Sequence, residues 1–319
     1  MTGIISPGLY FDMPTDEYFA DPAPEPSLSQ SLVKVLIEQS PLHARQAHPR
    51  LAVKLSEDEE PAAEKYDAAK AIGNAMHAIT LGRGKVCSVI DQPNFTTKEA
   101  KIAKAAALNA GHEPVLRKHW MIANQMYLAL KFQLNSIPDC ELAFRLDAGD
   151  SEVIAVADED GLWLRTMMDF VTKDLRQVWD LKTSGMSAAP WNTGKVMASA
   201  GWQIQAAMHE RILDAIDPEG RGRRRFFYVM QENEAPFALT VSEIGEAALT
   251  IGRKQIQYAV DAWRSCLQSG QWPAYPARIN RPELPGWVET SWINREIEEY
   301  EERQAASLQP KMLNSLAGG

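Results

Sequence analysis

Residues 165–183 read Arg-Thr-Met-Met-Asp-Phe-Val-Thr-Lys-Asp-Leu-Arg-Gln-Val-Trp-Asp-Leu-Lys-Thr. Two apolar runs flank a short polar turn, which predicts paired strands that each carry one acid, Asp169 and Asp180. Side chains two apart in a strand share a face, so we expect Asp180 and Lys182 to enter one site while Leu181 enters the core. Two acids and a lysine can hold a cation and position a water, and such oxygen-rich sites suit Mg²⁺ or Mn²⁺ better than zinc.

The composition is that of an ordinary globular protein. Of 319 residues, 45% are hydrophobic and 24% charged, enough for one large domain with elaborations or two modest ones. The sequence contains neither a long uninterrupted apolar run nor a secretory signal, which predicts a protein without a membrane partner. Scattered cysteines without a CxxC pair favour a reduced, cytoplasmic protein without an iron–sulfur cluster.

The charge distribution argues weakly against a protein that coats nucleic acid. The net charge is −9 and the isoelectric point is near 5.3. One dense basic run, at residues 221–225, is equally consistent with a solvated loop and with a DNA contact. A nuclease remains compatible with this balance, because acids gather at metal sites while a local basic groove binds phosphate.

The order of periodic segments predicts an α/β fold with a central mixed sheet flanked by helices. Helical spacing is found at about 27–40 (with Ser27 or Ser29 as cap), 63–82, 97–110, 114–135, 201–213 and 243–268, and a charged helix near 296–303. Strand patterns lie within 141–183, with turns at Gly149-Asp150 and 158–161, and at 225–231 and 236–242. We expect an N-terminal part with an irregular segment (1–26), a helix and an acidic linker (1–62), a core (63–272) and a Pro/Trp-containing segment with a charged helix and tail (273–319).

An ordered set of motifs extends along the chain: Tyr10-Phe-Asp-Met-Pro-Thr-Asp-Glu-Tyr18, Leu28-Ser-Gln-Ser-Leu32 with Ser40-Pro41, Gly73-Asn-Ala-Met-His77, Met168-Asp169, Trp179-Asp-Leu-Lys-Thr183 and Gln205-Ala-Ala-Met-His209. In this set the chain resembles, over most of residues 8–290, phage and prophage exonucleases of the RecE (exonuclease VIII) type, in the PD-(D/E)XK nuclease superfamily. It departs at Met-Met-Asp169, where the family often has Arg-Pro-Asp or Lys-Pro-Asp, and at His209, where a tyrosine is usual. It is also far shorter than the longest RecE proteins and resembles only their C-terminal nuclease part.

The resemblance implies a restriction-endonuclease-like core with an N-terminal helical elaboration. It also implies a Mg²⁺-dependent exodeoxyribonuclease, with Mn²⁺ as a substitute, that digests linear double-stranded DNA from its ends. Family members degrade the 5′-ended strand and leave a 3′ overhang, which a RecT-type single-strand annealing protein uses in recombination. They assemble as rings, so we expect a homo-oligomer here, a trimer or tetramer.

The candidate metal ligands are Asp169, Asp180 and the carbonyl of Leu181. By resemblance, His77 binds or supports a second metal, and an upstream acid joins the site; Glu141, expected to begin the first strand, is the candidate, although an exposed strand-end carboxylate is nearly as consistent. Lys182 would orient or help deprotonate the attacking water and offset the phosphate charge. Gln205 would bond a phosphate or a ligand acid, with His209 four residues on along the same helix face.

Candidate DNA contacts are mostly small polar groups: Ser29, Ser31, Lys34, Ser40, Thr183 and His209. Helix capping explains Ser29 and Ser31 equally well. Trp191 and Trp202 are candidates to stack on an unpaired base, although most of the nine tryptophans should serve packing.

Two other functions remain open on the sequence. One is a structure-specific endonuclease like the CRISPR-associated nucleases that carry an iron–sulfur cluster, which the missing four-cysteine set disfavours. The other is a non-catalytic DNA-binding module that kept the fold, which intact Asp169, Asp180 and Lys182 disfavour. The acidic segment 57–60 reads as a partner-docking surface or, more simply, as a solvated linker.

Overall fold

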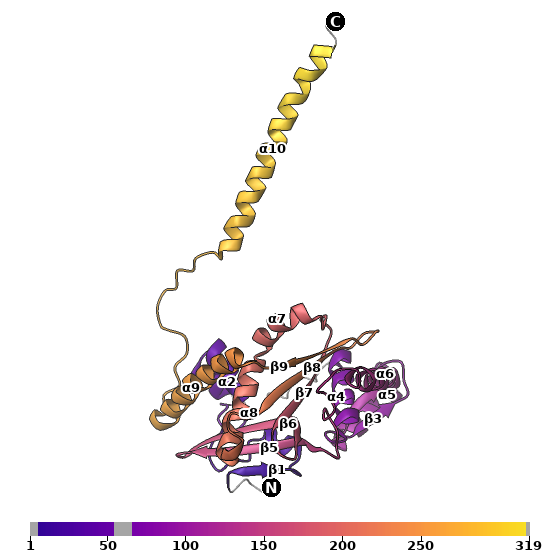
Figure 1. Cartoon of the computed structure of the whole chain (residues 1–319), viewed down its shortest axis with the longest axis vertical. Helices are drawn as coiled ribbons and strands as arrows, with labels where there is room; N and C mark the ends of the chain where they lie inside the picture. Colours follow the sequence, from indigo (N-terminus) through magenta and orange to yellow (C-terminus); the bar gives the residue numbers. More distant parts are fainter. Residues whose placement is uncertain (1–5, 54–65, 317–319) are drawn as a thin grey trace. The chain divides into compact units, whose positions relative to one another are not determined.

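The expected hairpin lies at the centre of a mixed sheet. The computed structural model describes residues 6–53 and 66–316. Strands β5 (Gly149–Glu159), β6 (Leu162–Thr172) and β7 (Gln177–Ser184) run antiparallel in succession, and β8 (Arg225–Glu232) joins β7 in parallel. The sheet order is β1–β5–β6–β7–β8–β9, with β1 at Gly8–Tyr10, β9 at Leu239–Glu243, and β2 (Leu28–Ser29) paired with β6. The predicted mixed sheet flanked by helices is confirmed (Figure 1).

Helices cover both faces of this sheet (Figure 1). On one face, α2 (Gln30–Glu38), α8 (Trp202–Ile216) and α9 (Glu246–Ser269) share a core with side chains such as Met168 and Tyr228. On the other face, α4 (Ala68–Leu81) and α6 (Arg117–Leu134) pack with Trp179 and Leu181. The site residues on β7 therefore lie between two helical layers, with α8 on one side and α4 on the other.

Local sequence accounts for the ends of the two helices that border the site. The Asp67 carboxylate accepts hydrogen bonds from the backbone N–H groups of Ala69 and Lys70, which caps α4. Gly82, with φ 62°, ends α4 in the left-handed conformation that glycine adopts without strain. Gly201, with φ 79°, separates the newly observed helix α7 (Pro190–Ala200) from α8. The sequence pattern did not predict α7, which buries none of its side chains.

A buried polar cluster fixes the N-terminal segment to the sheet. Asp21 Oδ1 lies 2.9 Å from Arg165 Nη1 on β6, and Asp21 Oδ2 lies 3.0 Å from His48 Nε2. The Ser27 hydroxyl donates to Asp21 over 2.6 Å. Burial raises the pKa of Asp21, but the His48 and Ser27 hydrogen bonds and the Arg165 charge outweigh burial and hold this pKa below its ordinary value.

Several local expectations were wrong. Residues expected to be irregular contain β1 and α1 (Thr15–Phe19), and Gly149-Asp150 begins β5 instead of forming a turn. The helix expected from 114 begins at Arg117, because Glu113–Leu116, apolar from residue 114 on, forms strand β4. This strand runs parallel to β3 (Cys87–Ile90) beside α5 (Lys98–Asn109). Such short apolar runs do not distinguish strand from helix by periodicity.

The other predicted helices are present, and their ends agree with the prediction to within a few residues. A short helix, α3 (Pro41–Ala47), follows Ser40. The second compact unit, residues 276–319, contains α10 (Gly286–Leu316), which includes the charged helix expected near 296–303. The acidic segment 57–60 lies outside the described residues. No helix in the described part of the chain combines the length and apolar character that crossing a bilayer requires.

Candidate active site

Asp180 and Lys182 project together from β7, as the strand alternation predicts. The Asp180 side chain is buried, and its Oδ1 lies 2.6 Å from Lys182 Nζ. Leu181 between them is fully buried in the core against α4. Desolvation lowers the pKa of Lys182, but Asp180 and Asp169 outweigh desolvation and raise it above its ordinary value. Lys182 is therefore a protonated, charge-bearing group rather than a base in the described structure.

Asp169 lies beside Asp180 on the neighbouring strand. The pairing of Phe170 with Trp179 places Asp169 opposite Asp180 one residue further along the two strands. The backbone N–H of Leu181 donates to Asp169 Oδ2 over 2.9 Å. Burial and the Asp180 carboxylate raise the pKa of Asp169 to about 6, against the opposing charges of His77 and Lys182. Because burial and the Asp180 carboxylate raise the proton affinity of Asp169, this pair of acids forms a site that favours a cation.

His77 reaches the same place from α4. Its Nε2 donates to the Leu181 carbonyl over 2.8 Å, and its Nδ1 lies 3.8 Å from Asp169 Oδ2. The two residues that the sequence proposed as nitrogen and carbonyl ligands thus contact each other. The helix also approaches β7 closely at Gly73, where an added Cβ would lie 2.8 Å from Thr183 Oγ1.

Helix α8 closes the opposite side. Gln205 Nε2 donates to Asp180 Oδ2 over 2.5 Å, which places the predicted glutamine on a candidate ligand acid. His209 is buried, and its Nδ1 lies 2.9 Å from the Thr166 hydroxyl on β6. Burial lowers the pKa of His209 to about 4, so the imidazole is neutral near pH 7. As placed, His209 supports the site from within and does not offer a surface to DNA.

Tyr228 on β8 is a neighbour that the sequence did not single out. It pairs with Asp180 across the parallel strands, and Lys182 Nζ lies 5.9 Å from the centre of its ring. Its hydroxyl donates to the Trp202 carbonyl over 3.1 Å, and the two rings stack at 4.9 Å. Trp202 is buried, so its expected stacking on a base does not fit this structure. Trp191, by contrast, is 84% exposed on α7.

Glu152 is the second neighbour that the sequence did not single out. On β5 it falls between Ser151, paired with Phe170, and Val153, paired with Met168, and so lies opposite Asp169. It adopts φ 51°, which is uncommon for a residue other than glycine, and it interrupts the pairing there. Burial raises the pKa of Glu152 above its ordinary value. The charge of His77 and a hydrogen bond from Thr15 act in the opposite direction but are outweighed. Glu152, Asp169 and Asp180 thus occupy opposing positions on three adjacent strands, although the Glu152 side chain lines a separate pocket with Thr15 and Arg83.

Glu141 does not begin a strand. It lies in a turn before β5 and lines a different pocket, with Tyr127 and Arg145 among its neighbours. The expected strand start was wrong because residues 141–148 form successive turns and the sheet begins at Gly149. Of the two acids, Glu152 is therefore the one whose position on the sheet is adjacent to Asp169.

The other candidate DNA contacts are mostly engaged within the protein. The Ser29 and Ser31 hydroxyls lie 3.0 Å apart, and the Ser40 hydroxyl lies 2.7 Å from His43 Nδ1 at the start of α3. Lys34 Nζ donates to the Ser199 carbonyl at the end of α7 over 2.7 Å. Thr183 differs, because it lines a pocket together with His77.

The donor set suits a hard divalent cation. Asp169, Asp180 and the Leu181 carbonyl supply oxygen atoms, as Mg²⁺ or Mn²⁺ prefers. Asp180 Oδ1 is buried and has an ionic contact with Lys182 but no hydrogen bond of good geometry. Within residues 6–53 and 66–316, no three His, Cys, Asp or Glu side chains stand close enough to hold one ion as placed. A cation here would therefore rely on the two aspartates, the carbonyl and water.

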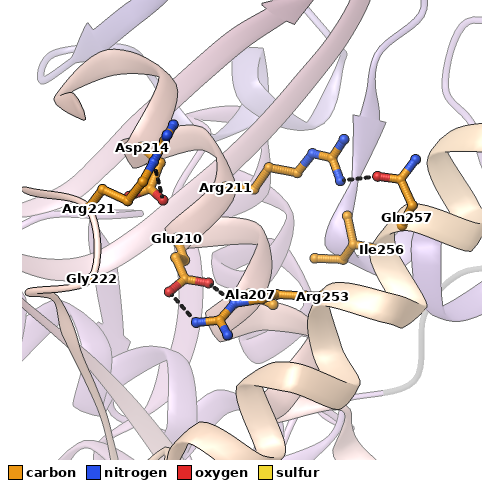
Figure 2. Close-up of a pocket in the computed structure, with 9 residues that line it drawn as sticks. All are labelled: Ala207, Glu210, Arg211, Asp214, Arg221, Gly222, Arg253, Ile256 and Gln257. Carbon is orange, nitrogen blue, oxygen red and sulfur yellow. Dashed lines mark hydrogen bonds and ion pairs between the residues drawn. The ribbon is translucent and has the colours of Figure 1, made fainter.

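A separate pocket of about 460 Å³ lies on the outer side of α8, against α9 (Figure 2). Its arginines already have acidic partners: Arg253 forms a two-bond pair with Glu210, and Arg221 contacts Asp214. Arg211 likewise pairs with Glu159 through two bonds of 2.6 and 2.7 Å. Because these charges are balanced locally, the pocket is a poor phosphate site, and we do not assign the chemistry to it.

Most arginines of the basic run at 221–225 likewise form ion pairs within the protein. Arg224 is buried and contacts both Asp214 and Asp217. Arg225 pairs with Glu243 on β9 over 2.8 Å. Internal ion pairing therefore accounts for most of the run without DNA.

Comparison with solved structures agrees with this fold. One solved structure, described as "Putative exonuclease" from Eubacterium rectale, is similar with a TM-score of 0.51 and 11% identity, covering 86% of this chain and 95% of that chain. At this identity the likeness shows the fold alone. A second, SSO0001, is matched with a TM-score of 0.24 and 12% identity over 59% of this chain and 85% of that chain, too weakly to carry an argument. No curated protein matches the sequence.

A family model describes most of the chain. The model of the "PDDEXK-like domain of unknown function (DUF3799)" matches residues 43–281. This range contains Asp169, Asp180 and Lys182, the acids and lysine in the order that the PD-(D/E)XK pattern names. The fold, the site and the family together indicate a nuclease-like hydrolase. The chain belongs to the PDDEXK-like family DUF3799, within the PD-(D/E)XK nuclease superfamily.

Proposed function

We propose that the protein is a Mg²⁺-dependent exodeoxyribonuclease that degrades linear double-stranded DNA from its ends, in the 5′ to 3′ direction. The observation that carries the proposal is the convergence of Asp169, Asp180 and Lys182 on adjacent strands, with Lys182 Nζ 2.6 Å from Asp180. The preference for ends, the polarity and a role in recombination are supported by the resemblance to RecE-type nucleases.

The roles of the side chains follow from their contacts. When bound, a divalent cation supplies charge stabilisation and an acidic water; Asp169, Asp180 and the Leu181 carbonyl would hold it, and His77 or Glu152 would support it. Gln205 fixes the Asp180 carboxylate by donating to Oδ2. Lys182, kept protonated by the two acids, offsets the charge that grows on the phosphate and orients the water.

One assay separates this proposal from its alternatives. The protein is incubated with linear and with closed circular duplex DNA, each in Mg²⁺ and in EDTA. We expect metal-dependent loss of the linear DNA alone, and fragments labelled at either 5′ end should lose label first. Nicked or cut circles would instead indicate an endonuclease, and DNA retardation without degradation would indicate a binding module.

We also propose that the enzyme works as a homo-oligomeric ring, a trimer or tetramer, beside a single-strand annealing protein of RecT type. This proposal rests on the family resemblance. Light scattering on the purified protein measures the oligomer directly, and a monomeric mass at micromolar concentration would contradict the ring.

A further inference from the structure

A polar pocket opens directly beside the acids, between α4 and the ends of β7 and β8. We call it the α4–β8 pocket; its volume is about 310 Å³ and its lining includes Lys70, Asn74, His77, Thr183, Gly185 and Asn233. His77 belongs to both the pocket and the candidate active site, since it also contacts Leu181 and Asp169. Thr183 directly follows Lys182. Anything bound in this pocket therefore adjoins the reacting groups.

The chemistry of the lining suits an anion. Among the lining residues that the structure describes, Lys70 is a cation and none is a carboxylate. A pocket near Glu152, of about 510 Å³, differs because its lining mixes Arg83 and Lys85 with Asp12, Asp16 and Glu152. A polyanion gains more from the α4–β8 pocket, where none of the described lining residues is an acid.

The pocket also offers hydrogen-bonding groups without partners. The side-chain amides of Asn74 and Asn233, both half-buried, form no hydrogen bond within the described part of the chain. The Asn233 backbone is held in place, since its N–H donates to the Ser184 carbonyl over 2.9 Å. Amide, hydroxyl and lysine groups are the usual partners of DNA phosphates.

The same lining argues against a nucleobase. Bases in single strands bind by stacking on aromatic side chains, each worth about 1–3 kcal/mol. The described lining contains no Phe, Tyr or Trp, and it includes Gly73 and Gly185. The pocket thus fits the sugar–phosphate backbone and gives no means of reading sequence.

We propose that the α4–β8 pocket binds a phosphate of the cleaved strand, adjacent to the scissile phosphate, independently of base sequence. The inference rests on the proposed nuclease function and identifies which part of the substrate this surface recognises. The two asparagine amides hold the phosphate, and this contact sets the position of the strand relative to Lys182.

Gly185 provides a way to fill the pocket without touching the acids. A Cβ on residue 185 would meet only the Asn233 amide, at 3.8–4.0 Å, so a larger side chain extends into the open space. Gly185→Leu is therefore the blocking variant. Gly245→Leu is the matched control, because a Cβ at residue 245, the N-cap of α9, meets nothing within 4 Å. Asn233→Ala removes one amide and leaves the space open.

The test compares linear duplexes that carry one uncharged methylphosphonate linkage at successive positions. We expect wild type and Gly245→Leu to slow at least tenfold when one particular linkage next to the cleaved one is uncharged. Gly185→Leu should digest unmodified DNA at least tenfold more slowly and lose sensitivity to that linkage, because the contact is already absent. The digestion rate of Asn233→Ala and its sensitivity to that linkage should lie between those of wild type and Gly185→Leu.

Binding provides a second readout that does not depend on the reaction. In EDTA, the anisotropy of a labelled duplex should show weaker binding by Gly185→Leu than by Gly245→Leu, with abasic sites having no effect. The inference is overturned if Gly185→Leu digests and binds DNA as wild type does. It is also overturned if the methylphosphonate slows Gly185→Leu by the same factor as it slows wild type, or if abasic sites slow digestion where methylphosphonates do not. Failure of wild type to digest any DNA would instead refute the proposed function itself, and the inference with it.

Discussion

Replacing Lys182 by alanine is the most direct test of the site. The Lys182 ammonium group lies 2.6 Å from Asp180 Oδ1. Asp180 also accepts a hydrogen bond from Gln205 and pairs with Tyr228 on the neighbouring strand. Removing one preorganised charged group from a reaction centre costs about 3–4 kcal/mol of transition-state stabilisation. Each 1.36 kcal/mol is a factor of ten, so we expect the rate of DNA digestion to fall roughly 10²- to 10³-fold.

The cost to folding should be smaller than the cost to the reaction. Removing one partner of a fully buried ion pair costs about 3–5 kcal/mol, whereas an exposed pair contributes about 0–1 kcal/mol. The Lys182 side chain is 34% exposed while Asp180 is 2% exposed, so we expect an intermediate loss of about 1–2 kcal/mol. Gln205 continues to satisfy one oxygen of the Asp180 carboxylate.

The assay is single-turnover digestion of linear duplex DNA in Mg²⁺, run beside urea unfolding of the same samples. Lys254→Ala, on the exposed face of α9, is the matched control and should change neither quantity. Lys182→Arg keeps the charge and should recover part of the rate. Digestion by Lys182→Ala within threefold of wild type, with the fold intact, would refute the electrostatic role assigned to Lys182.

Three further predictions address the surrounding structure. Glu152→Gln should lower digestion about tenfold through lost metal support, whereas Glu141→Gln should leave it unchanged; equal effects would contradict the assignment. Gly252→Ala should lower the free energy of unfolding by about 1–3 kcal/mol in urea, despite better helix propensity, because its Cβ would clash with an α8 backbone carbonyl; an unchanged midpoint would contradict this close approach. Because the native pKa of Asp21 is depressed, its stabilisation is complete above the unfolded pKa of about 3.9 and is lost as pH falls through the native value. The stability gap between wild type and Asp21→Asn should therefore shrink as the pH falls below about 4, whereas a gap at pH 3 equal to the gap at pH 5 would exclude this linkage.

Local patterns predicted the parts of the site that depend on one element. Strand periodicity placed Asp180 and Lys182 on one side and Leu181 on the other, and the structure confirms this arrangement. Helical spacing likewise predicted the helix that carries His77. These features repeat within a few residues, so neighbouring sequence determines them.

The features that were missed depend on contacts between distant segments. Glu152 lies opposite Asp169 only through the β5–β6 register, and its positive φ has no local signal such as glycine. Trp202 looked available for stacking, but Tyr228, from a later strand, covers its ring. Tertiary pairing of this kind overrides what a single segment prefers.

The parallel pairing of β7 with β8 has a consequence for biosynthesis. Parallel neighbours require a long crossover, and here residues 185–224 separate the strand that carries Asp180 from the strand that carries Tyr228. During translation the acids therefore leave the ribosome well before the strand and helix that enclose them. A nascent chain that ends before about residue 232 lacks β8, so the site is completed only after most of the polypeptide has been synthesised.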